Sequence, residues 1–163
     1  MRNSLKTLLV ASLLTVGACG GGSEGKNLER FAGVWAPTSG TQTTSCGGQP
    51  TTSPTTDSVT WSLGSSSDLI QPVLSQTSCF LHADVDGDTA SLVGTATCMI
   101  PSTDYYGYAV NNTVTLSAYT FALSADGKTA TENFSGSILQ TDNGTGTSVS
   151  CSFSETAGSY QKQ

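Results

Sequence analysis

Most of the chain alternates between apolar and polar residues, and short turn sequences separate the alternating segments. Residues 59–63 and 79–85 show this pattern most clearly. Asp86-Gly87, Asp126-Gly127 and Asn143-Gly144 are dipeptides typical of hairpin turns. Because a period of two is the pattern of half-buried β-strands, the sequence predicts antiparallel strands joined by tight turns.

The predicted fold is all-β, an antiparallel up-and-down meander of seven to nine strands. Such a sheet removes its edges by closing on itself, so we expect a small closed barrel or a β-sandwich. Ser and Thr make up 49 of the 163 residues, and strong helix formers are scarce, which disfavours a helical bundle. The expected strands lie at 33–36, 59–63, 69–74, 79–85, 89–100, 105–110, 113–123, 131–139 and 149–153.

Three details of this expectation concern loops and edges. The Thr-, Ser- and Pro-rich residues 38–57 predict a loop at their centre. Asn111-Asn112 predicts a turn, and Pro72 favours an edge strand for residues 69–74. The single β-domain is expected to span residues 30–163, a typical size for one domain.

Residues 1–18 have the features of an export signal, in which Arg2 and Lys6 precede a short apolar run. The run ends at Val16-Gly17-Ala18-Cys19, which resembles the lipobox of bacterial lipoproteins; the alternative is an ordinary signal peptide. The resemblance implies a diacylglycerol on Cys19. It also implies the outer membrane, because Gly20 stands where inner-membrane lipoproteins often have Asp. Residues 19–29 are expected to form a flexible, Gly-rich tether.

Four further cysteines predict two disulfides in an exported chain, and sequence alone leaves three pairings open. These residues are Cys46, Cys79, Cys98 and Cys151. The chain has no C-x-x-C pair and a single histidine, His82, which disfavours a zinc site. We expect no metal and no other cofactor.

Charge and chemistry favour a protein that is neither an enzyme nor a nucleic-acid binder. From Cys19 onward the chain has 4 basic and 12 acidic residues, a net charge of 4 − 12 = −8. The chain contains no G-x-S-x-G motif, so His82 has no recognisable serine nucleophile to activate as the base of a hydrolase. Most acidic residues fall in predicted turns, where Asp is favoured on backbone grounds. The residues 84–88, Asp-Val-Asp-Gly-Asp, lack the spacing of a calcium-binding EF-hand loop.

Two motifs resemble lipocalin signatures. Gly33-Val34-Trp35 resembles G-x-W, and residues 103–108, Thr-Asp-Tyr-Tyr-Gly-Tyr, resemble T-D-Y-x-x-Y. The resemblance implies an eight-stranded barrel around an apolar cavity, with Trp35 closing one end. Lipocalins also have a C-terminal helix and a late arginine that packs over this tryptophan. Here no arginine follows Arg30, and residues 151–163 have no helical pattern.

The aromatic residues are the candidate binding residues. Adjacent residues of a strand face opposite sides, so one of Tyr105 and Tyr106 is expected to face outward, as tyrosines at binding patches do, or to pack under the loop of residues 50–54. The full candidate set is Trp35, Trp61, Tyr105, Tyr106 and Tyr108.

The first functional hypothesis is a non-enzymatic, lipid-anchored envelope lipoprotein that binds a protein or glycan partner. The alternative is a lipocalin-like carrier of a small apolar ligand. Only 33 residues from Cys19 onward are large apolar or aromatic. We therefore expect a packed interior with at most a small cavity, and tryptophan fluorescence that does not respond to apolar ligands.

Overall fold

The computed structural model describes residues 27–73, 79–103 and 107–163 of the chain. Within these residues there is no α-helix, and none of the helical residues forms a segment long and apolar enough to cross a membrane. The elements are a 3-10 helix η1 (Leu28–Arg30) and the strands β1 (Gly33–Ser39), β2 (Thr41–Cys46), β3 (Gln49–Pro54), β4 (Val59–Leu63), β5 (Leu69–Pro72), β6 (Phe80–Asp86), β7 (Thr89–Leu92), β8 (Ala96–Thr103), β9 (Ala109–Leu123), β10 (Thr129–Asp142) and β11 (Ser148–Lys162).

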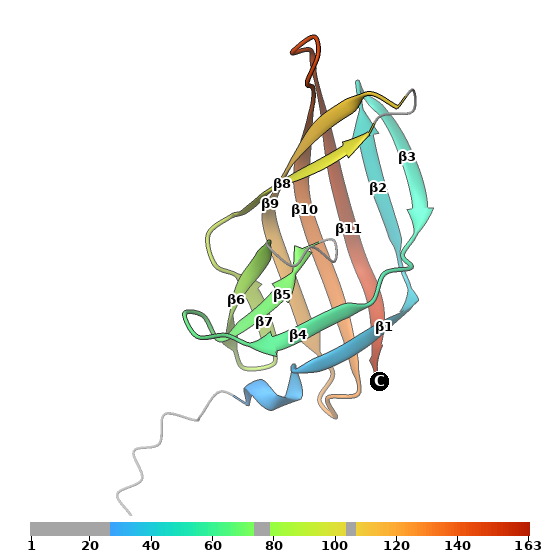
Figure 1. The fold of residues 1–163 in the computed structure, drawn as a ribbon. Coiled ribbons are helices and arrows are strands. Elements are labelled where there is room, and N and C mark those ends of the chain that lie inside the picture. The colour runs from blue at the N-terminus through green and yellow to red at the C-terminus, as the bar shows by residue number, and fades with distance from the viewer. Residues whose placement is uncertain (1–26, 74–78, 104–106) are drawn as a thin grey trace, which may run out of the picture.

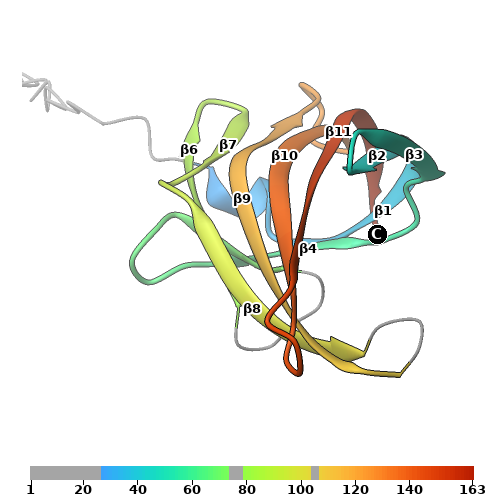
Figure 2. The same cartoon turned by 90° about the horizontal axis from the view of Figure 1, so that it is seen from above.

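Eight of these strands follow one another around a ring-like sheet. Hydrogen bonding runs through β1, β4, β5, β6, β7, β9, β10 and β11, and β1 pairs with both β4 and β11, which closes the ring. Seen from above, the strands surround a common centre (Figure 2). The predicted antiparallel all-β fold is confirmed, with eleven strands rather than seven to nine.

The three longest strands extend beyond the ring. β9 and β11 have 15 residues each and β10 has 14. Along β11, residues 159–162 pair with β1 and residues 151–155 pair with β2. Along β9, residues 120–122 pair with β7 and residues 109–116 pair with β8. Past the ring, β8 and the β2–β3 hairpin flank the three long strands (Figure 1). We call the inner face of this extension the trough.

The expectation of a loop at the centre of residues 38–57 is wrong, because β2 and β3 form a hairpin there. Gly47 and Gly48, with φ of 59° and 83°, form its two-residue turn, a geometry that such hairpins require and glycine readily adopts. β3 is exposed along its length and pairs only with β2 among the described strands. An edge strand of this kind tolerates Pro50 and Pro54.

Four smaller expectations are also wrong. Asn111 and Asn112 lie within β9 rather than in a turn. β5 pairs with β4 and β6, so it is not an edge, and Pro72 is its last residue. Leu63 is half exposed, although the alternation of residues 59–63 predicts that it shares a buried face with Val59 and Trp61. The expected strand at 89–100 is two strands, β7 and β8, separated around Gly94, whose φ is 69°.

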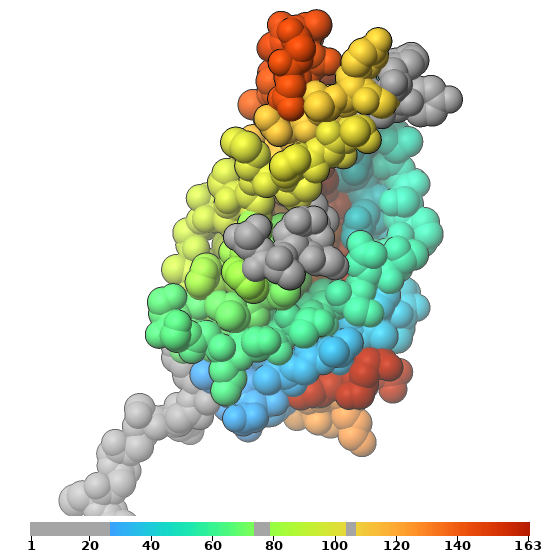
Figure 3. All heavy atoms as spheres, in the orientation of Figure 1, coloured from blue at the N-terminus to red at the C-terminus, as the bar shows by residue number. Residues whose placement is uncertain are grey.

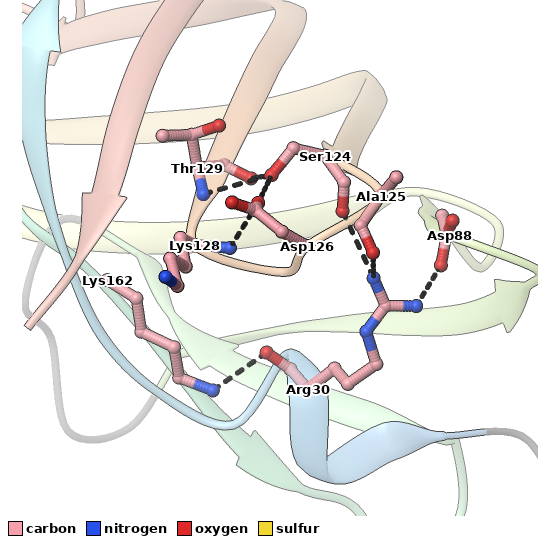
Figure 4. Close-up of polar contacts among 8 residues, drawn as sticks. All are labelled: Arg30, Asp88, Ser124, Ala125, Asp126, Lys128, Thr129 and Lys162. Atoms are coloured by element: carbon pink, nitrogen blue, oxygen red, sulfur yellow. Dashed lines mark hydrogen bonds and ion pairs between the residues drawn. The ribbon is translucent and has the colours of Figure 1, made fainter.

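Arg30, at the end of η1, closes one end of the ring (Figure 4). Its guanidinium forms an ion pair with Asp88 in the turn between β6 and β7. It also donates hydrogen bonds to the backbone oxygens of Ser124 and Ala125, 3.0 and 3.1 Å away, at the turn between β9 and β10. One side chain therefore joins the N-terminal segment to two separate turns.

Lys162, near the end of β11, contacts the same segment. Its Nζ donates hydrogen bonds to the backbone oxygens of Arg30 at 2.8 Å and Glu29 at 3.2 Å (Figure 4). The same Nζ lies 5.4 Å from the centre of the Trp35 ring, within the range of a cation–π contact. The cation over Trp35 is thus a lysine in the last strand, where the lipocalin resemblance implies an arginine.

The core lies between the ring strands and is built around aromatic rings. Trp35 is fully buried, and its Nε1 donates a hydrogen bond to the backbone oxygen of Phe31 at 2.8 Å. Phe121 meets Trp35 edge-on at 5.2 Å and Trp61 at 6.0 Å, and Trp61 meets Tyr119 at 5.7 Å. Such edge-to-face contacts stabilise aromatic cores beyond the area they bury. Other buried members are Val59, Leu69, Leu81, Ala83, Val85, Ala90, Leu116, Leu123, Ala130 and Tyr160.

Both predicted disulfides are confirmed, and their pairing is now defined. Cys46 of β2 lies directly opposite Cys151 of β11, and the two are bonded over a sequence separation of 105 residues. Cys79, next to β6, is bonded to Cys98 of β8 over 19 residues. Each bridge therefore ties one side of the trough, the β2–β3 hairpin or β8, to the ring strands.

Candidate functional site

A cavity of about 460 Å³ lies inside the sheet, next to the aromatic core. Sites for small molecules typically have volumes of roughly 300–1,000 Å³. The molecule is hollowed between β8 and the β2–β3 hairpin (Figure 3). The apolar part of the cavity wall includes Leu81, Val114, Leu116, Phe134, Ile138 and Phe153.

A second hollow of about 280 Å³ continues this surface into the trough. It shares Thr44, Val114 and Ile138 with the cavity, and it adds Ile100 and the Cys46–Cys151 disulfide. The apolar surface therefore runs along the inner faces of β9 and β10 for several residues. A ligand longer than the cavity itself can extend along it.

Polar side chains gather at the end of the cavity that borders the core. Glu132 of β10 is 2% exposed, and its Oε2 accepts a hydrogen bond from the Tyr160 hydroxyl at 2.5 Å. The Tyr119 hydroxyl donates to Oε1 of Gln71 at 3.1 Å. All four side chains line the cavity, and the described residues lining it include no Lys, Arg or His. Glu132 therefore has no cationic partner in the cavity wall.

Burial controls the protonation of this group of residues. Loss of contact with water raises the pKa of Glu132 from 4.5 to about 7, the neighbouring hydroxyl groups of Tyr119 and Tyr160 oppose the rise, and the charge of Glu155 adds to it. Burial, followed by the charge of Glu132, raises the pKa of both Tyr119 and Tyr160 above 10. Both phenols therefore remain hydrogen-bond donors at neutral pH, where Glu132 is partly ionised.

This pKa predicts that Glu132 makes stability depend on pH. The folded-state pKa is higher than the unfolded one, so stability present below pH 4.5 is lost as the pH rises through about 7. A shift of this size corresponds to about 3 kcal/mol. We expect Glu132→Gln to remove this loss. Urea unfolding at several pH values measures it, and parallel pH profiles for the variant and the natural protein would contradict the prediction.

Glu155 of β11 is a second buried carboxyl, and it has a structural role. Its Oε1 accepts a hydrogen bond from the Thr55 hydroxyl at 2.5 Å, and Thr55 N–H donates to the Gly40 oxygen at 3.1 Å. A Cβ on Gly40 or Gly158 would lie 2.4 or 2.1 Å from Oε1, so both positions require glycine. Glu155 therefore positions the corner between β1 and β2, and it is not among the residues lining the cavity.

The aromatic candidates from the sequence do not assemble into one site. Trp35 and Trp61 are buried in the core, and neither lines the cavity. Tyr108, next to β9, is 65% exposed. Tyr105 and Tyr106 lie outside the described residues, as do the predicted signal peptide 1–18, the lipidation residue Cys19 and the tether up to residue 26.

The expectation of a packed interior is wrong, because the cavity is of ligand size. That expectation rested on the small number of large apolar residues. The wall also contains polar and small side chains, such as Gln42, Thr44 and Ser58. The strands also extend past the core. A count of apolar residues does not measure the volume that such a sheet encloses.

Glu132 and Glu155 were missed because acidic residues were expected in turns. The sequence pattern does indicate the position of Glu132. It is two residues from both Ala130 and Phe134 in the alternating segment, so it lies on the same face of the strand, and these two residues face inward. For Glu155, alternation along the strand does not predict which face the side chain occupies, because β11 is irregular near Ala157, whose φ is 56°.

The residues considered for metal binding or catalysis have other contacts. Among residues 27–73, 79–103 and 107–163, no group of three or more His, Cys, Asp or Glu side chains is placed to hold a metal ion. Asp88 forms the ion pair with Arg30, and Asp84 Oδ1 accepts a hydrogen bond from the backbone N–H of Asp68 at 3.3 Å. Nδ1 of His82 lies 3.0 Å from the Ser67 hydroxyl on the exposed face of β6.

Comparison with known proteins found no match: no protein-family model, no curated protein and no solved structure matches the chain. The functional argument therefore rests on the cavity and the residues that line it.

Proposed function

We propose that this protein is a non-enzymatic binding protein of the bacterial cell envelope that holds a small amphipathic molecule in its cavity. The cavity supports this proposal: it has the volume of a small-molecule site, a wall that is mostly apolar in area, and a hydrogen-bonded group of polar side chains around Glu132 beside the core. This proposal is the carrier hypothesis drawn from the lipocalin resemblance, and the volume of the cavity is the reason for preferring it to a partner-binding module.

The test is saturable binding of an apolar fluorescent probe to protein purified without its lipid. We expect micromolar or tighter binding, and loss of binding in Val114→Trp, because Val114 lines both hollows and an indole would fill the space between them. Val34→Trp is the matched control, since Val34 is exposed on β1. Equal binding by both variants, or no saturable binding to the natural protein, would contradict the proposal.

The envelope location rests on the N-terminal sequence. The segment Val16-Gly17-Ala18-Cys19 supports attachment to the outer membrane through a lipid on Cys19. Two acyl chains hold a protein on a bilayer stably. We therefore expect Cys19→Ser to move the protein from the membrane fraction to the soluble fraction after a high-salt wash. Continued sedimentation of the variant with membranes would show that Cys19 is not the anchor.

A second candidate function is the binding of an envelope protein or glycan, and an exposed apolar surface favours it. Met99 is 70% exposed and Leu139 is 44% exposed. Both are paired with Thr113 across neighbouring strands, so they lie on the outer face of the trough. Met and aromatic residues are enriched at interfaces. A crosslinker placed at Met99 in intact cells should capture one defined partner, and one at Asp86 should not.

A further inference from the structure

We infer that the ligand of the cavity is an organic cation with an apolar body, whose ammonium group binds Glu132. This inference rests on the proposed function and adds to it the charge of the ligand. It follows from the position of one buried carboxyl at the core end of an apolar cavity.

The charged groups of the cavity wall are all acidic. Glu132 and Asp57 line the cavity, and the described lining residues include no cation. The ion pair found among the described residues, Arg30–Asp88, lies outside the cavity at the closed end of the ring. Burying a carboxylate without a charged partner is costly. A cationic ligand would supply the partner that the protein does not.

The hydrogen-bonding groups beside Glu132 also suit an ammonium group. Tyr160 already donates its hydroxyl proton to Glu132, and Tyr119 donates to Gln71. The lone pairs of the two phenol oxygens and of the carboxylate can therefore accept hydrogen bonds from an ammonium. Hydrogen bonds between two charged groups are about twice as strong as neutral ones. A carboxylate ligand would instead place a second negative charge beside Glu132.

The apolar wall fixes the direction of the rest of the ligand. From Glu132, β10 presents Phe134 and then Ile138 to the cavity. Phe153 of β11 lies beside Phe134, with 5.9 Å between the ring centres. Beyond Ile138 the surface continues into the trough past Ile100. An alkyl or aryl group attached to the ammonium would therefore lie along these side chains.

Protonation of Glu132 makes the expected preference for a cationic ligand depend on pH. The titratable groups that act on Glu132 or on its partner Tyr160 are Tyr119 on β9, Glu155 on β11 and Asp57 before β4. Burial raises the pKa of Glu132 to about 7, so its negative charge is absent at pH 5. An alkylamine keeps its positive charge at pH 5 and at pH 8, since its pKa is near that of lysine.

Calorimetric titration with dodecylamine, dodecanol and dodecanoate tests the inference, with the amine and the acid below their micelle concentrations and the alcohol below its solubility limit. At pH 8 we expect the amine to bind roughly ten- to a hundredfold more tightly than the alcohol, and the acid to bind most weakly. At pH 5 the preference for the amine should disappear. Glu132→Gln should remove it at pH 8, and a circular dichroism spectrum that matches that of the natural protein shows that the variant is folded.

Asp86→Asn is the matched control, because it removes one negative charge from the exposed end of β6, away from the cavity. It should keep the preference for the amine. Equal binding of amine and alcohol at pH 8, or an unchanged preference in Glu132→Gln, would overturn the inference while leaving the proposed function intact. Absence of binding by all three compounds would overturn the proposed function itself.

Discussion

Removing the Cys46–Cys151 disulfide with the double substitution Cys46→Ser and Cys151→Ser is expected to lower the free energy of unfolding by about 4–5 kcal/mol. The bridge closes a loop of 105 residues, so it strongly restricts the unfolded chain. It also holds β2 against β11, and the outer strand β3 is exposed along its length. Urea unfolding under non-reducing conditions measures the change.

The second disulfide provides the control for this prediction. Cys79–Cys98 closes a loop of only 19 residues, for which the same chain-entropy argument gives about 3 kcal/mol. The double serine variant of that pair should therefore be less destabilised than the variant lacking Cys46–Cys151. The reverse order would show that loop length does not set the contribution of these bridges.

Trp35→Ala is expected to lower the free energy of unfolding by about 3–5 kcal/mol. The indole is fully buried, contacts the Phe121 ring edge-on and lies under the ammonium of Lys162. Truncation leaves a cavity in the core and removes the hydrogen bond from Nε1 to the Phe31 oxygen. Denaturant unfolding monitored by circular dichroism avoids relying on the lost fluorophore.

Val34→Ala is the matched control, one residue away on the same strand. Val34 is 44% exposed, and surface substitutions of this kind change stability by about 0.5 kcal/mol or less. If Trp35→Ala and Val34→Ala were equally mild, the closed end of the ring would not depend on the indole. The 3-10 helix and its contacts with Arg30 and Lys162 would then hold that end without it.

The sequence predicted those parts of the fold that local alternation determines. In β6, residues 81, 83 and 85 are buried and their neighbours are exposed, because a half-buried strand must alternate. Hairpins are predicted at Asp86-Gly87 and Asp126-Gly127, and the structure has one at each place, with Gly87 and Gly127 at positive φ. The two-residue turn of the first hairpin is Gly87-Asp88, because Asp86 pairs with Thr89. These features depend on residues close together in the chain.

Other parts depend on contacts between distant segments, and local patterns do not predict those contacts. The β2–β3 hairpin has no apolar alternation, and its pairing with β11 and its disulfide hold it in place. Lys162 reaches Trp35 only because β11 returns beside β1 at the end of the chain. The pairing of the cysteines depended on strand order in the same way.

The candidate site could be predicted only in part. Parity within β10 indicates that Glu132 faces inward, but the sequence does not reveal that Tyr119 of β9 and Tyr160 of β11 line the same end of the cavity. That meeting depends on the register of three long strands and on the bulge near residue 133. The volume of the cavity depends on side chains from seven strands, so composition alone misjudged it.

The place of η1 has a consequence for the orientation of the molecule. It lies at the end of the ring opposite the trough (Figure 1). A lipid on Cys19 would be separated from Asn27 by eight residues, which span at most about 29 Å. β9, with 15 residues, is about 50 Å long. This length exceeds the reach of the tether, so the domain could not invert to point the trough at the bilayer. The mouth of the trough would then open away from the anchoring bilayer, and a ligand would enter from the aqueous compartment or from a protein on the facing side.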